Sequence, residues 1–151
     1  MNTELEELYQ QVILDHSKRP RNYGGLPGAV SVHGDNPSCG DEIDLHVKFG
    51  PDGSVENVMF TGSGCAISQA SASLMTVKLK GKPRAEAEEF LHAFHQLVTS
   101  DTEPAMKGLG DLILLRGVRK FPQRVKCAML PWRAFEQALR EPGGTVTTEV
   151  E

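Results

Sequence analysis

Three cysteines, Cys39, Cys65 and Cys127, are all that the 151-residue chain contains, and each stands in a setting that suits a metal ligand. Cys39 lies in Asn-Pro-Ser-Cys-Gly-Asp at 36–41, and Cys65 follows a Gly-Ser-Gly break at 62–64. Zinc and iron–sulfur clusters are held by about four soft or borderline ligands. With the carboxylate of Asp41 the chain has such a set, provided that the fold brings its members together.

Each of these residues also has a simpler interpretation when it is taken alone. The three cysteines could be small buried side chains, and Asp41 could be a turn former. Loop residues surround Cys39, however, and loops are seldom buried. Cys65 precedes a predicted helix, whose amides would stabilise a thiolate, and Lys126 could do the same for Cys127. A solvated surface position is the ordinary alternative for Lys126.

Other candidate sites are weaker. His92 and His95 share an i, i+3 spacing on an amphipathic segment, which favours a solvated helix face over a metal site. The Gly-Ser-Gly stretch at 62–64 lacks the lysine and the spacing of a phosphate-binding loop. No Ser/His/Asp set can be proposed from the order of residues.

Length and composition bound the class of protein. A chain of 151 residues predicts one domain, which we place at 1–141, with 142–151 as a flexible C-terminal tail. The net charge of -4 gives no reason to expect nucleic acid. No apolar run approaches the ~18 residues of a membrane span, and the start of the chain is acidic where a signal peptide is basic. We expect a cytoplasmic protein, in which an odd number of cysteines favours metal binding or reactivity over disulfides.

The elements that must position these residues follow from local patterns. A capping box at Thr3 and Glu6 predicts an N-terminal helix with an apolar face through Ile13. Strands are predicted at 29–33, 42–49 and 54–61, and helices at 65–80, 84–98, 112–118 and around Trp132. We expect Pro131 to lie in the first turn of the last helix or to kink it, so that Cys127 is not in a plain helix interior. The pattern is α+β: a small three-stranded antiparallel sheet packed against about five helices.

Taken together, the motifs resemble the U-type iron–sulfur cluster assembly scaffold family, which includes IscU and the N-terminal part of NifU. The resemblance rests on 36–41, on Gly-Ser-Gly-Cys-Ala-Ile-Ser at 62–68 and on Lys-Cys at 126–127. It also covers Leu-Tyr at 8–9 and the stretch from 16 to 24. The resemblance implies Cys39, Asp41, Cys65 and Cys127 as the metal ligands.

Departures from the IscU type indicate a branch. Lys126 stands where IscU-type scaffolds carry histidine, and 121–126 lacks their chaperone-recognition stretch. The region 82–109 looks like an insertion that lengthens the spacing between Cys65 and Cys127. These features resemble the SufU branch, which implies a zinc protein that accepts sulfur from a SufS-like cysteine desulfurase and passes it to downstream cluster assembly proteins. Binding of the specialised IscU-type chaperone is not expected.

The leading hypothesis is therefore a zinc-dependent sulfurtransferase with Cys39 as the sulfur acceptor, assisted by the charge of Lys126. In this hypothesis Cys39 is a mobile loop ligand, and Asp41 moves with it when the site opens. The first alternative is a scaffold on which the same residues assemble a 2Fe–2S cluster, and a second is a structural zinc module. Cys127 remains an alternative acceptor.

Overall fold

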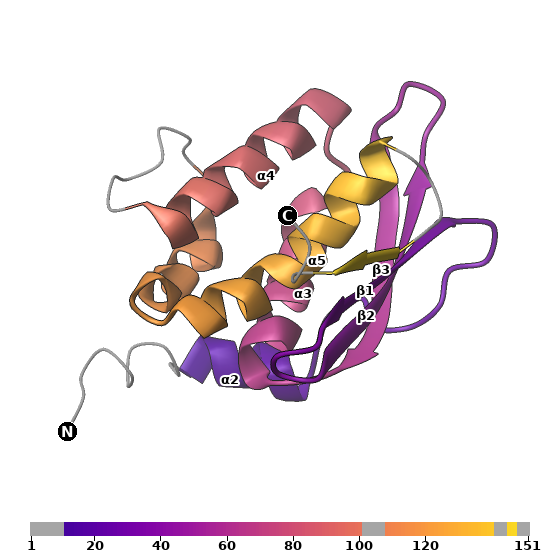
Figure 1. Cartoon of the computed structure of the whole chain (residues 1–151). Coiled ribbons are helices and arrows are strands. Elements are labelled where there is room, and N and C mark those ends of the chain that lie inside the picture. The colour runs from indigo at the N-terminus through magenta and orange to yellow at the C-terminus, as the bar shows by residue number, and fades with distance from the viewer. Residues whose placement is uncertain (1–10, 101–107, 141–144, 148–151) are drawn as a thin grey trace.

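The computed structural model describes residues 11–100 and 108–140 and the backbone of a strand at 145–147. In chain order the elements are α2 (Gln11–Lys18), β1 (Val30–Asn36), β2 (Asp41–Phe49), β3 (Val55–Ser63), α3 (Ala66–Leu79), α4 (Arg84–Thr99), the 3-10 helix η1 (Gly110–Lys120), α5 (Pro122–Arg140) and β4 (Thr145–Thr147). The α+β class is confirmed (Figure 1). The predicted capping box at Thr3 and Glu6 lies outside the described residues.

The three-stranded antiparallel sheet is also confirmed. Strand β2 lies in the middle, paired with β1 from Val30↔Val47 to Asn36↔Asp41 and with β3 on its other side. Both β1 and β3 extend beyond their predicted ends, and β1 reaches Asn36 at the turn that carries Cys39. The sheet therefore delivers Cys39 and Asp41 to one end of its central hairpin.

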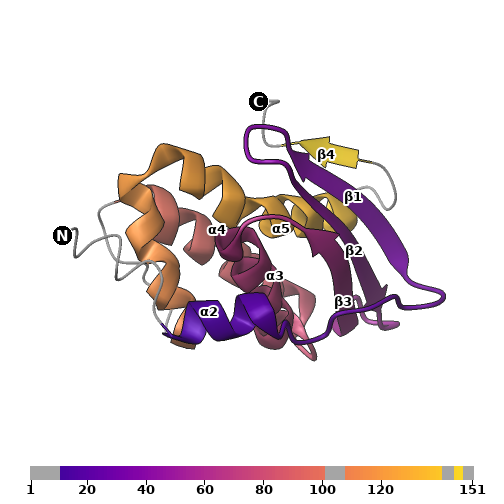
Figure 2. The same ribbon diagram turned by 90° about the horizontal axis from the view of Figure 1, so that it is seen from below.

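A fourth strand was not predicted. Strand β4 pairs in parallel with β1 from His33↔Thr145 to Asp35↔Thr147, which gives the order β3-β2-β1-β4 (Figure 2). The tail at 142–151 thus contributes a strand that hydrophobic patterning could not indicate, because the run is short and rich in threonine. The flexibility of the tail residues around β4 stays a prediction.

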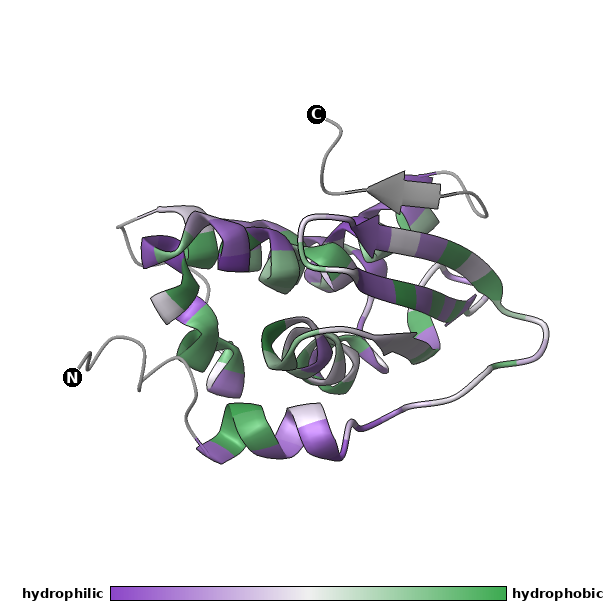
Figure 3. Ribbon diagram, turned by 60° about the horizontal axis from the view of Figure 1, so that its bottom comes forward, coloured by the Kyte–Doolittle hydropathy of each residue, from purple (hydrophilic) through white to green (hydrophobic). Residues whose placement is uncertain are grey.

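The helices cover one face of the sheet. Helices α3 and α5 lie against it, and α2 runs along α3 (Figures 1 and 2). Alternation along β2 buries Ile43, Leu45 and Val47 and leaves Glu42 and Asp44 exposed. In Figure 3 green, hydrophobic residues alternate with purple, hydrophilic residues along the strands and the helices. The largest buried side chains include Phe60, Phe94, Trp132 and Phe135. Among the described residues, no helix is long and apolar enough to cross a membrane.

Helix α5 differs from its predicted form. It begins at Pro122, a residue suited to a first helical position, and continues through Pro131. Cys127 therefore lies inside the same helix as Pro131, and the alternative in which Pro131 lies in the first turn of that helix is wrong. Pro131 has no N–H and cannot donate a helical hydrogen bond to the carbonyl of Cys127. The next carbonyl along the helix, that of Ala128, accepts a 2.6 Å hydrogen bond from Ser71 Oγ of α3. This contact ties the two site-bearing helices together close to Cys127.

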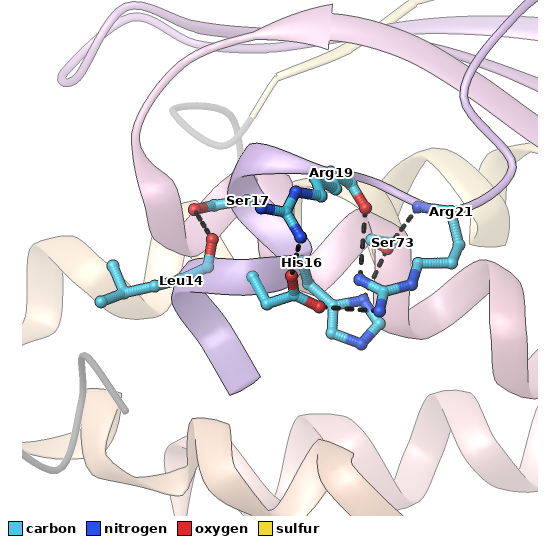
Figure 4. Close-up of polar contacts among 7 residues, drawn as sticks. Leu14, His16, Ser17, Arg19, Arg21 and Ser73 are labelled. Carbon is cyan, nitrogen blue, oxygen red and sulfur yellow. Dashed lines mark hydrogen bonds and ion pairs between the residues drawn. The ribbon is translucent and has the colours of Figure 1, made fainter. Parts of the chain in front are cut away.

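The end of α2 and the segment that follows it dock onto α3 (Figure 4). His16 is buried, and its Nδ1 lies 2.7 Å from Ser73 Oγ. The same Ser73 oxygen accepts a 2.8 Å hydrogen bond from the Arg21 backbone N–H. Beyond this point Gly24 donates to the Phe60 carbonyl at 2.8 Å, so the segment also covers the free edge of β3. The role of His16, which had no signal in the sequence, is thus structural.

Candidate metal centre

Cys39 lies in the four-residue turn that joins β1 to β2. Its N–H and that of Gly40 both donate to the Asn36 carbonyl, at 3.2 and 2.9 Å. Gly40 has φ of +73°, a conformation that glycine adopts without the strain of a side chain. The turn leaves the side chain of Cys39 half-buried. The backbone of this turn is thus fixed by hydrogen bonds, while the side chain of Cys39 is only partly covered.

Cys127 meets this turn from α5. Its Sγ lies 3.5 Å from the Sγ of Cys39, and its side chain is fully buried. One ligand atom from each of Cys39, Asp41 and Cys127 can be chosen so that all three lie within 4.8 Å of one another. The structure therefore brings together three of the four predicted ligands, from the sheet and from the last helix.

Asp41 is anchored on both sides. Its Oδ1 accepts a 2.8 Å hydrogen bond from the Cys65 N–H, and its Oδ2 accepts one of 3.2 Å from Asn36 Nδ2. The side chain is 1% exposed, and no ion pair among the described residues includes it. This anchoring within β2 does not support the expectation that Asp41 moves with Cys39.

Cys65 lies beside the group of three. It is the residue that precedes α3, and its Sγ is 3.9 Å from Asp41 Oδ2. It does not belong to the set whose ligand atoms lie within 4.8 Å of one another. All four predicted ligands thus gather at one end of the sheet, with Cys65 at the margin of the cluster.

The thiols of Cys65 and Cys127 influence each other. Hydrogen bonding with Cys127 lowers the pKa of the Cys65 thiol to about 6, although burial acts in the opposite direction. The hydrogen bond with Cys65, followed by burial, raises the pKa of the Cys127 thiol above its ordinary value. The contact between the two sulfurs therefore favours the thiolate form at Cys65 and the protonated form at Cys127. Metal binding at thiols displaces such protons.

Lys126 occupies a different surface of α5. Successive residues of a helix point about 100° apart, and Lys126 lines a cavity of about 70 Å³ between α4 and α5. His95, Thr99, Met129 and Arg133 are among the other residues that line this cavity. A role of Lys126 at the thiols stays a prediction. His92 and His95 are exposed, as predicted for a solvated helix face.

Sequence reasoning missed two residues of the site. Asn36 belongs to the motif at 36–41, but sequence reasoning assigned it no role of its own. Its side chain is fully buried and donates to both Asp41 and Cys127. Gly64 has φ of +150°, and a Cβ there would lie 2.3 Å from Asp41 Oδ1. The alternation of β1, which buries Val32 and Asn36, could have indicated the first residue. No sequence signal could have indicated the contact of Gly64, because it depends on how β2 meets α3.

The donor set fits zinc or an iron–sulfur cluster. Thiolate sulfur and carboxylate oxygen are ligands that zinc accepts in four-coordinate sites, and thiolates hold clusters of iron and sulfur. A buried carboxylate without a cationic partner is costly, and a bound cation would remove that cost. The burial of Asp41 beside the sulfurs of Cys39, Cys65 and Cys127 meets this condition.

Comparisons with known proteins agree with this geometry. The model of the NifU-like N-terminal domain family matches residues 8–128. The chain is 46% identical over 138 residues to the iron–sulfur cluster assembly scaffold protein IscU of Streptococcus pyogenes serotype M1, covering 91% of this chain and 86% of the relative. It is 44% identical over 144 residues to the zinc-dependent sulfurtransferase SufU of Bacillus subtilis, covering 95% and 97%.

A solved structure of a related protein has the same fold. It comes from Fervidobacterium islandicum AW-1 and is described as an iron–sulfur cluster assembly scaffold protein for the SUF system. The two chains superpose with a TM-score of 0.81 at 36% sequence identity, covering 88% of this chain and 97% of the other. The likeness thus extends over nearly the whole of both chains.

Proposed function

The chain belongs to the NifU-like N-terminal domain family, and from that premise we propose that it serves iron–sulfur cluster assembly as a zinc-bound acceptor of sulfur. The sulfur donor would be the persulfide of a SufS-like cysteine desulfurase, and downstream cluster assembly proteins would receive it. The observation that carries the proposal is the pairing of a half-buried Cys39, at a hairpin turn, with a buried Cys127 and Asp41.

Cys39, Asp41, Cys65 and Cys127 would hold the zinc. When bound, zinc would keep the thiols deprotonated at neutral pH and shield them from oxidation. Three of these residues are anchored by the fold: Asp41 by two hydrogen bonds, Cys65 at the start of α3, and Cys127 within α5. The site therefore has one ligand, Cys39, whose sulfur can turn outward without disturbing a regular element.

In the transfer step, Cys39 acts as the nucleophile. Its thiolate attacks the outer sulfur of the desulfurase persulfide, and a bond forms between that sulfur and Cys39 Sγ. The sulfur–sulfur bond of the donor breaks, and its electron pair stays with the desulfurase cysteine as a thiolate. Because the turn backbone is hydrogen-bonded to Asn36, we propose that the thiolate becomes available by rotation of the side chain.

The second candidate function is a scaffold that assembles a 2Fe–2S cluster on the same residues. It is favoured by the likeness to the Streptococcus pyogenes protein, which is named a scaffold. In this alternative Cys39 would remain a ligand throughout, and the cluster would leave as a unit. The missing chaperone-recognition stretch at 121–126 weighs against the IscU type, and weak binding of that chaperone stays a prediction.

Purification without added metal distinguishes the two functions. The proposed function predicts a colourless protein with about one zinc per chain, measured by elemental analysis. A red-brown protein that contains iron and acid-labile sulfide, and little zinc, would favour the scaffold. A colourless protein without zinc would contradict both.

A further inference from the structure

We propose that Asn36 is a positioning residue that holds Asp41 and Cys127 as the fixed half of the metal centre and leaves Cys39 as the exchangeable ligand. The inference rests on the proposed zinc site and assigns a role to a residue outside its ligand set. It concerns how the site opens: which sulfur stays in place, which one is released, and what makes the difference.

The side chain of Asn36 is placed between two ligands. It is fully buried, and its Nδ2 lies 3.2 Å from Asp41 Oδ2 and 3.5 Å from Cys127 Sγ. An amide nitrogen carries two hydrogens, so it can serve both acceptors at once. When zinc holds Asp41 and Cys127 as anions, the opposite amide orientation would set the amide oxygen against a carboxylate and a thiolate, which repel it. The two acceptors therefore fix the orientation of Asn36.

The backbone of Asn36 contacts the third ligand in another way. Its carbonyl accepts the hydrogen bonds from the Cys39 and Gly40 amides, so it shapes the turn that carries Cys39. Asn36 pairs with Asp41 across the last rung of the hairpin. One residue thus fixes the position of Asp41 and Cys127 through its side chain, and of the Cys39 backbone through its carbonyl.

This asymmetry distinguishes the two sulfurs chemically. A hydrogen bond from an N–H to a thiolate draws electron density from the sulfur and makes it a poorer nucleophile, while it orients the ligand toward the metal. Cys127 receives such a bond from Asn36 and is buried within α5. Cys39 is only half-buried and lies in a turn rather than in a helix. The arrangement favours Cys39 as the sulfur that leaves the metal and reacts.

The experiment compares Asn36→Ala and Asn36→Asp with the wild type and with the control Asn57→Asp. Asn57 lies in β3 of the same sheet, and its Oδ1 accepts the Val58 N–H, a bond that aspartate keeps. Zinc release to a chromophoric chelator is followed for each protein. We expect release about ten to a hundred times faster in both Asn36 variants, as for other outer-shell partners of metal ligands. The control should release zinc at the wild-type rate.

Two further readouts separate positioning from a merely structural role. Asn36→Asp preserves the volume of the side chain, so packing alone predicts that alanine harms zinc retention more. The proposal predicts that aspartate harms it more, because it adds a negative charge among anionic ligands. In the cobalt(II)-loaded Asn36→Ala protein, the thiolate-to-cobalt charge-transfer band should move to longer wavelength, because Cys127 has lost its hydrogen bond.

The outcomes are distinct. Unchanged zinc release and an unchanged cobalt band in Asn36→Ala would overturn the role of Asn36 while the zinc site stands. Greater zinc loss in the alanine than in the aspartate variant, with no band shift, would assign Asn36 to packing and overturn it too. If Asn36→Asp does not fold, the alanine variant decides alone by release rate and band position. A wild-type protein that holds neither zinc nor cobalt would overturn the site itself.

Discussion

The Sγ atoms of Cys39 and Cys127 lie 3.5 Å apart, although 88 residues separate them in the chain. One sulfur belongs to a hairpin turn and is half-buried, and the other belongs to a helix and is fully buried. The two sulfurs therefore share a site but differ in exposure and in how firmly they are held. The predictions below follow from this difference and from the anchoring of Asp41.

Zinc binding should require all three cysteines. We expect about one zinc per chain in the wild type, and loss of most of it in Cys65→Ser and Cys127→Ser, because a serine hydroxyl is a poor substitute for thiolate. Elemental analysis after gel filtration measures the ratio of metal to protein. Since Cys65 lies at the margin of the cluster, its variant is the critical one. Full zinc retention in Cys65→Ser would remove that residue from the site.

Replacing Asp41 should loosen the metal and also weaken the joint between β2 and α3. Asp41→Ala removes the acceptor of the Cys65 N–H, a loss comparable to that of a helix cap and worth about 1 kcal/mol of unfolding free energy. We expect faster zinc release and, after reconstitution with iron and sulfide, more iron–sulfur absorbance. Asp44→Ala is the control, because Asp44 lies on the outer, exposed face of the same strand. Equal zinc release in the two variants would argue against Asp41 as a ligand.

Gly64→Ala should displace Asp41. A Cβ at this position would lie 2.3 Å from Asp41 Oδ1, and the residue has φ of +150°. We expect a loss of about 1–3 kcal/mol in unfolding free energy, together with faster zinc release. Gly28→Ala is the matched control, since Gly28 also has positive φ but nothing within 4 Å of its Cβ position. Denaturant unfolding measures the loss of stability, and a chelator assay measures zinc release. Equal zinc retention in the two variants would contradict the predicted displacement of Asp41.

Protonation of His16 should destabilise the fold. Burial, together with the charge of Arg21, lowers the pKa of His16 below its ordinary 6.5, so the unfolded chain binds this proton more readily. Stability that depends on neutral His16 is therefore present above pH 6.5 and is lost as the pH falls from 6.5 through the lower folded-state pKa. Melting temperature against pH measures the effect, with the exposed His95→Gln as control. His16→Gln should flatten this part of the profile, and an unchanged profile would contradict the assignment.

Local patterns were sufficient to predict most of the elements, though not β4, and to predict the ligand candidates. The cysteine settings identified Cys39, Cys65 and Cys127 as candidates, and alternation located the strands that position Asp41. What the patterns could not supply depends on tertiary contacts. The hydrogen bond from Asn36 to Cys127 is recognised only once α5 packs on β1, and the contact of Gly64 only once α3 meets β2. The start of α5 at Pro122, ahead of Pro131, was not predicted, because it depends on packing against α3, where Ser71 donates to the Ala128 carbonyl.

The most direct test of the central claim is to locate the transferred sulfur. The zinc-loaded protein is mixed with a SufS-like cysteine desulfurase and cysteine, trapped with an alkylating reagent, digested and examined by mass spectrometry. Cys39→Ser serves as the control and should no longer enhance desulfurase turnover, even where it retains some zinc. The account predicts the added sulfur on the peptide that contains Cys39, because Cys39 is only half-buried and lies in a turn, whereas Cys127 is buried within a helix. Added sulfur on the peptide that contains Cys127 would contradict it.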